Sequence, residues 1–120
     1  MKAKMNLRLL ICTILLEVPL VAGALPAFPG ASGAGAASVG GRGGIIYEVT
    51  NLNSIGPGSL HNGIAMKGPR IIVFRVSGTI EAPNGLTISE PYITIAGQTA
   101  PGGGITISGK SSIYDVFNIK

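Results

Sequence analysis

The chain has 120 residues, enough for one small domain, and a single cysteine, which excludes a disulfide framework. It carries 9 Lys and Arg against 5 Asp and Glu, for a formal net charge of +4. Three of these cations, Lys2, Lys4 and Arg8, lie at the N-terminus, and no basic cluster with interleaved aromatic residues follows. The charge therefore argues against a nucleic-acid-binding protein.

Residues 1–24 have the organisation of a secretory signal peptide. The basic start is followed by the apolar run Leu9–Leu16 and by the small residues Ala22–Ala24. The run is interrupted too early to be a membrane span, which needs roughly 20 apolar residues. An N-terminal anchor that stays attached is the alternative. Cleavage after Ala24 would remove Cys12 and leave a secreted domain, residues 25–120, in an extracellular or periplasmic compartment.

Residues 25–44 are rich in Pro, Gly, Ala and Ser. This composition is typical of a flexible lead-in, but the cluster Gly40–Gly44 also fits an ordered loop that passes close to another part of the chain. Arg42, between two glycine pairs, is a candidate to bind an anion or a saccharide, or to anchor the loop through a salt bridge. The first predicted strand is Ile45–Thr50.

One helix is expected after residue 24. Asn51–Gly58 has turn chemistry, and Ser59 occupies an N-cap position before a helix over Leu60–Met66. Gly63 weakens this helix by about 1 kcal/mol relative to alanine. Gly68-Pro69 ends it.

The remaining chain is strand-like. Two copies of one short motif, Ile93–Gly97 and Ile105–Gly109, are separated by a Gly- and Pro-rich spacer that predicts a turn and not a helix. Alternation places two aliphatic residues on one face of each short strand and a threonine on the other. The predicted strands are Arg70–Val76, Thr79–Glu81, Leu86–Ile88, Tyr92–Ala96, Ile105–Ser108 and Ile113–Ile119.

The strand pattern alone leaves two all-β architectures open. A sandwich can be built from such short strands, although Asn84-Gly85 is the only dipeptide of the two-residue hairpin type between them. In a solenoid, each strand pairs with the equivalent strand one coil later, aliphatic side chains stack inside, and glycines occupy the corners. The repeated Ile-Thr-Ile motifs would then be successive faces of a parallel β-helix.

Several segments occur in a fixed and familiar order and resemble the start of secreted pectate lyases of the polysaccharide lyase family 1 type. The resemblance covers nearly all of Leu25 to Gly109. The segments that carry it are Leu25–Ala31, Gly40–Gly44, Val49–Asn53, Gly56–Leu60, Gly68–Phe74, Val76–Ile80 and Ile93–Gly102.

The resemblance implies an all-β fold, a right-handed parallel β-helix (solenoid) of which this chain forms the N-terminal cap with one short helix, Ser59–Met66, and the first coils only. It also implies a secreted enzyme that cleaves pectate (polygalacturonate) by β-elimination. In the family, calcium neutralises the uronate group and an arginine removes the neighbouring proton. The implied partner is the polysaccharide, with no nucleic acid and no stable membrane span, and the full-length protein is expected to be a monomer.

The resemblance assigns no catalytic, cofactor-binding or metal-binding residue here, because the family's calcium carboxylates and arginine come after the matched region. The four acids that follow the signal are scattered, so no bound calcium is expected in this chain, and the chain alone is expected to be inactive. Whether it is an enzyme is left open. The four acids are Glu48, Glu81, Glu90 and Asp115.

The chain departs from the family pattern at several positions. The family usually has an acidic residue at Ser32, Arg-Glu at His61-Asn62, and Asp at Arg75 and Gly103. The departures at Ser32, Arg75 and Gly103 favour an alternative, a non-catalytic β-helix of the carbohydrate-binding or adhesin type. A truncated reading frame is a further alternative, because the chain ends within a predicted strand.

Three other signals are better explained by structure than by function. Gly104–Ser111 matches a phosphate-loop expression, but its interior is a strand sequence and no helix follows. His61 is the only histidine and is expected on the helix surface, not in a metal site or a catalytic pair with Ser59. Tyr47, Tyr92 and Tyr114 could stack on sugars, but tyrosines scattered in strands usually contribute to packing.

Overall fold

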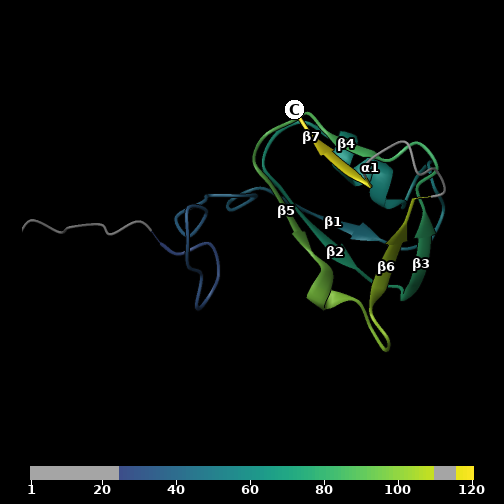
Figure 1. Cartoon of the computed structure of the whole chain (residues 1–120), viewed down its shortest axis with the longest axis horizontal. Helices are drawn as coiled ribbons and strands as arrows, with labels where there is room; N and C mark the ends of the chain where they lie inside the picture. The colour runs from purple at the N-terminus through teal and green to yellow at the C-terminus, as the bar shows by residue number, and fades with distance from the viewer. Residues whose placement is uncertain (1–24, 110–115) are drawn as a thin grey trace, which may run out of the picture.

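The computed structural model describes residues 25–109 and 116–120, and these residues form an all-β structure with one α-helix (Figure 1). The predicted signal peptide, Tyr114, Asp115 and the end of the phosphate-loop match lie outside the described residues. The elements are β1 (Ile45–Val49), α1 (Leu60–Ala65), β2 (Arg70–Phe74), β3 (Gly78–Glu81), β4 (Leu86–Ile88), β5 (Ile93–Ala96), the 3₁₀ turn η2 (Gly97–Thr99), β6 (Ile105–Ser108) and β7 (Phe117–Ile119).

Every strand pair among the described residues is parallel. Two successive strand triplets, β2–β3–β4 and β5–β6–β7, pair strand by strand, and β1 adds to the outer side of β2. Figure 1 shows the three resulting sheets facing a common interior. The described strands therefore do not form an antiparallel sandwich. Asn84-Gly85 turns a corner between two sheets, with the Gly85 N–H donating to Ala82 O at 3.0 Å, and does not close a hairpin.

The register stacks like residues on like. Ile72 of β2 lies beside Ile95 of β5, and Ile80 of β3 lies beside Ile107 of β6. Ile72 and Ile80 are buried, whereas Thr79, which precedes Ile80 on β3, is exposed. The two Ile-Thr-Ile copies occupy consecutive strands of two different parallel sheets. The period-2 alternation thus supplies both the buried aliphatic columns and the polar exterior.

The helix α1 closes one side of the interior and confirms the predicted N-cap. Ser59 is extended, and its hydroxyl accepts the Asn62 N–H at 3.3 Å. The helix ends one residue earlier than predicted, with Met66 in extended conformation. A Cβ at Gly63 would lie 2.6 Å from Tyr47 Cδ1, so glycine is what lets the helix approach β1 this closely. Within the described part of the chain, no helix is long and apolar enough to cross a membrane.

The apolar core lies between α1 and the inner faces of the sheets. Its fully buried members come from the helix and from four strands or their ends, so the core depends on segments far apart in sequence. Burial of these side chains removes apolar surface from water, the main favourable term in folding. The core residues are Val49, Leu60, Ile64, Ile72, Phe74, Ile80, Ala82 and Leu86.

The spacer between the Ile-Thr-Ile copies was expected to contain no helix, and this expectation was wrong in part. Gly97–Thr99 forms one turn of 3₁₀ helix. The Thr99 hydroxyl donates to Ala96 O at 2.6 Å and the Ala100 N–H donates to Gly97 O at 3.1 Å. These two local bonds stabilise the turn. Because the turn has only three residues, it forms despite the low helix propensity of the spacer.

The segment 25–44 is an ordered loop, the second of the two alternatives that its composition left open. The N–H of Gly41 donates to the side-chain oxygen Oγ1 of Thr94, a residue of β5, at 2.9 Å. Ile45, the first residue of β1, donates its N–H to Pro69 O at 3.1 Å. These contacts place the last residues of the loop, 41–45, against β5 and against the residue that precedes β2.

Candidate functional site

Three of the four acids that the sequence analysis named lie within the described residues, and they do not converge. Glu48 lies on β1, Glu81 on β3, and Glu90 in the connection between β4 and β5. Among the described residues, no three His, Cys, Asp or Glu side chains gather into a group that could hold a metal ion. Calcium takes six to eight oxygen ligands, typically with several carboxylates. The donors described here therefore do not fit a calcium centre.

Glu48 makes the one ion pair found in the described residues. Arg75 Nε donates to Glu48 Oε1 at 2.9 Å, and Nη2 donates to the same oxygen. The hydrogen bond from Arg75, together with its charge, lowers the pKa of Glu48. Both side chains are exposed, so solvent and salt screen the pair. The guanidinium of Arg75 is therefore paired with Glu48 of β1, the strand next to β2.

Arg42 anchors its loop, but not through the predicted salt bridge. Its guanidinium donates to the backbone oxygens of Ser38 at 2.6 Å, Val39 at 3.1 Å and Leu25 at 3.1 Å. Backbone carbonyl groups, in place of a carboxylate, accept from Nε and Nη2 of the guanidinium. These bonds hold residues 25–42 as a closed loop.

The histidine and tyrosine positions have structural surroundings. His61 is exposed on α1, as expected. The Tyr47 hydroxyl donates to Ser59 O at 3.1 Å and accepts the Asn62 side-chain amide at 3.2 Å, which joins β1 to the helix. Tyr92 is 55% exposed and lies outside any strand. Ser32 and Gly103 are also exposed.

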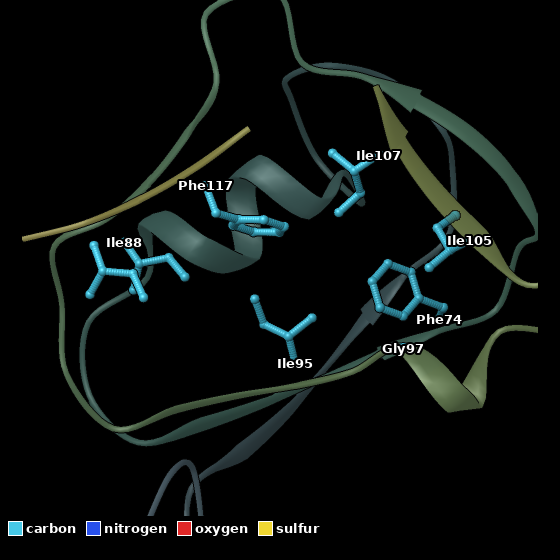
Figure 2. Close-up of a pocket in the computed structure, with 8 residues that line it drawn as sticks. Phe74, Ile88, Ile95, Gly97, Ile105, Ile107 and Phe117 are labelled. Atoms are coloured by element: carbon cyan, nitrogen blue, oxygen red, sulfur yellow. The ribbon is translucent and has the colours of Figure 1, made fainter. Parts of the chain in front are cut away.

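An open apolar pocket lies at the end of the interior that β5, β6 and β7 border. Its volume is about 350 Å³. Figure 2 shows the aliphatic and aromatic side chains that line it. None of the described residues that line it has a polar side chain, so these residues offer nothing to orient a saccharide or a cation. Its lining residues are Phe74, Ile88, Ile95, Gly97, Ile105, Ile107, Phe117 and Ile119.

Arg70 is the residue that the sequence analysis missed. It is fully buried, although arginine is rarely buried without a carboxylate. A signal was available, because alternation puts Arg70 on the same face of β2 as Ile72 and Phe74. Its guanidinium donates to backbone carbonyls, so it is part of the scaffold and not of a catalytic group.

Parallel strand pairs, stacked aliphatic columns and a short helix at one side define a small all-β protein whose described residues form a scaffold. Its sequence is similar to those of fungal proteins named probable pectate lyase C. The protein of Aspergillus oryzae is 54% identical over 86 residues, which are 72% of this chain and 20% of that protein. The protein of Aspergillus terreus is 55% identical over 86 residues, with the same coverage. The protein of Emericella nidulans is 50% identical over 99 residues, 81% of this chain and 23% of that protein.

These matches confirm the resemblance seen in the sequence, and the chain is homologous, over the matched residues, to proteins named probable pectate lyase C. The chain spans about a fifth of the length of the relatives it matches. No family model and no solved structure matches it.

Proposed function

We propose that this chain is the N-terminal part of a secreted polysaccharide lyase that cleaves pectate by calcium-dependent β-elimination, and that the chain alone is inactive. Identity above 50% to proteins named probable pectate lyase C is the observation that carries the proposal. We assign residues 1–24 to a removed signal peptide and residues 25–120 to the start of the secreted protein. The substrate class is polygalacturonate.

The fold we propose is a right-handed parallel β-helix, with α1 as part of its N-terminal cap. The triplets β2–β3–β4 and β5–β6–β7 would be its first coils. The parallel register of all three sheets supports this fold, because a chain that winds repeatedly around one axis brings equivalent strands side by side in the same direction.

The calcium requirement belongs, in this proposal, to the full-length enzyme. The described residues of this chain contribute the scaffold: stacked inner columns and the capped end. No step of the elimination is assigned to Glu48, Glu81 or Glu90, because they lie on separate elements and do not assemble a ligand set.

A chimeric enzyme tests the function. The 86 matched residues of this chain would replace their counterparts in the Aspergillus oryzae relative. We expect the chimera to release the unsaturated, ultraviolet-absorbing product from polygalacturonate, and chelation of calcium to abolish the release. The unaltered relative is the positive control, and a chimera with Ile80→Asp in the core is the folding control. An inactive, folded chimera would contradict the proposal, as would product formation by this chain alone.

A non-catalytic polysaccharide-binding protein is a second candidate, favoured by the Arg75–Glu48 pair at a position where the family commonly has Asp. The discriminating measurement is co-sedimentation of the chain with insoluble pectate in the presence and absence of calcium. Binding without cleavage by both the chain and the chimera would favour this second candidate.

A further inference from the structure

A buried arginine joins three segments of the backbone. The Arg70 side chain is 0% exposed, and its donors meet carbonyl oxygens and no carboxylate among the described residues. A buried charge is costly unless hydrogen bonds replace its hydration. Its acceptors are Gly63 O at 3.0 Å, Ile64 O at 2.6 Å, Gly68 O at 3.0 Å and Pro91 O at 3.1 Å, with Glu90 O at 3.5 Å.

The first of the three segments is the C-terminal turn of α1. The last carbonyls of a helix have no partner within the helix and carry partial negative charge. Gly63 and Ile64 belong to this turn, and Arg70 Nε and Nη2 satisfy their oxygens. The second segment is the turn between α1 and β2, held through Gly68 O. Arg70 therefore caps the helix from within the core.

The third segment is the corner Glu90–Tyr92 between β4 and β5. Tyr92 has φ of +59°, the only positive φ at a non-glycine residue in the described part of the chain. Such a conformation is strained for a tyrosine and persists only where the surroundings impose it. Tyr92 is 55% exposed, so its side chain is not enclosed by packing.

Arg70 contacts this corner from two directions. Its backbone N–H donates to Tyr92 O at 3.0 Å, and its guanidinium donates to Pro91 O at 3.1 Å. The carbonyls on both sides of the strained φ are thus fixed by the same residue. Release of the guanidinium would free Pro91 O and the helix carbonyls at once.

We propose that Arg70 is a conformational latch that holds Tyr92 in the left-handed region and couples opening of the Glu90–Tyr92 corner to release of the C-terminal end of α1. The helix and the corner then open together as one cooperative unit, although they lie more than twenty residues apart. This coupling is independent of the proposed enzymatic function.

Hydrogen exchange of the unmodified chain gives the first test. Amides at the end of α1 and amides at the corner should open with the same dependence on denaturant, because one event exposes both. In Arg70→Lys, exchange in both segments should rise by at least about 10-fold, since a lysine cannot satisfy the same set of carbonyls. Arg75→Lys, at the exposed ion pair, is the matched control and should leave both segments unchanged. Unequal denaturant dependence, or faster exchange in one segment only, overturns the proposal.

A double-mutant cycle gives the second test. Asparagine tolerates the left-handed region, so Tyr92→Asn should raise the melting temperature of the unmodified chain. In the Arg70→Lys background the corner is free to relax, and the same substitution should raise it by less than half as much. Additive effects would show that Arg70 does not hold Tyr92 and would overturn the latch. If Arg70→Lys does not fold, the exchange experiment on the unmodified chain still decides.

Discussion

The Thr99 hydroxyl accepts the backbone N–H of Phe74 at 2.8 Å. The same hydroxyl donates to Ala96 O at 2.6 Å, so a single side chain links the end of β2 to the 3₁₀ turn after β5. Phe74 is 2% exposed and belongs to the core. The contact therefore ties the core to the spacer that separates the two Ile-Thr-Ile copies.

Replacement of Thr99 by valine tests this link. The shape is kept, but the Phe74 N–H loses its acceptor, and an unsatisfied part-buried donor costs about 1–3 kcal/mol. We expect a loss of unfolding free energy at the lower end of that range, because Thr99 is exposed and water can reach the site. Urea denaturation measures the difference. Thr79→Val, on the exposed face of β3, is the matched control, and equal losses in both variants would contradict the assigned role.

The N-cap of α1 gives a second prediction. Ser59 is buried, accepts the Asn62 N–H and donates to Gly56 O at 2.6 Å. Ser59→Ala should lower the unfolding free energy by about 1 kcal/mol through loss of the cap. Gly56 O also loses the hydroxyl donor but keeps the backbone N–H of residue 59 at 3.2 Å, so this second contribution should be small. Thermal unfolding followed by circular dichroism measures it. Ser89→Ala, at an exposed position, should have little effect; a comparable loss there would argue against a specific cap.

The Glu48–Arg75 pair makes one feature of the protein depend on pH. Because the Arg75 hydrogen bond and charge lower the pKa of Glu48, folding favours the ionised carboxylate. The stabilisation is present above the unfolded-state pKa and is lost as the pH falls through the lowered folded-state pKa. NMR titration of the Glu48 carboxyl carbon should give a higher pKa in Arg75→Gln than in the unmodified chain. Glu81→Gln is the control and should leave the Glu48 titration unchanged; the same titration curve in Arg75→Gln would refute the pair.

Local structure was largely predictable from the sequence. Alternation over Leu86–Ile88 and Ile105–Ser108 gave strands with the observed bounds, and Ser59 before an apolar helical face gave the start of α1. In both cases the signal is local: side-chain period in a strand and a hydroxyl acceptor at a helix start. The predicted end of β2 at Val76 was two residues late.

Spatial relationships were harder to predict. The alternation of apolar and polar residues did not distinguish parallel from antiparallel strand pairing, because Ile80 would face the core in either arrangement. From the sequence, Gly63 was treated only as a residue that weakens the helix. In the structure, the absence of a side chain at Gly63 leaves room for the ring of Tyr47. The five-carbonyl surroundings of Arg70 depend on a corner twenty residues later, which no local pattern contains.

The apolar pocket bordered by β5, β6 and β7 predicts self-association of the isolated chain. Ile119 is 78% exposed and Phe117 is 38% exposed, both on the last strand of their sheet, and no charged residue lies within β7. Exposed strand edges with apolar side chains associate readily, and an inward-pointing lysine is an effective block. Ile119→Lys should therefore reduce the concentration-dependent increase in mass measured by light scattering.

A matched variant separates the apolar face from the strand edge. Asn118 lies on the same strand, between the two apolar residues, and points to the opposite face by alternation. Asn118→Lys adds the same charge to the same edge but leaves the pocket lining intact. If apolar surface drives association, Asn118→Lys should reduce it far less than Ile119→Lys does. Equal reductions would assign association to edge pairing and charge, and a monomeric unmodified chain at high concentration would refute the prediction.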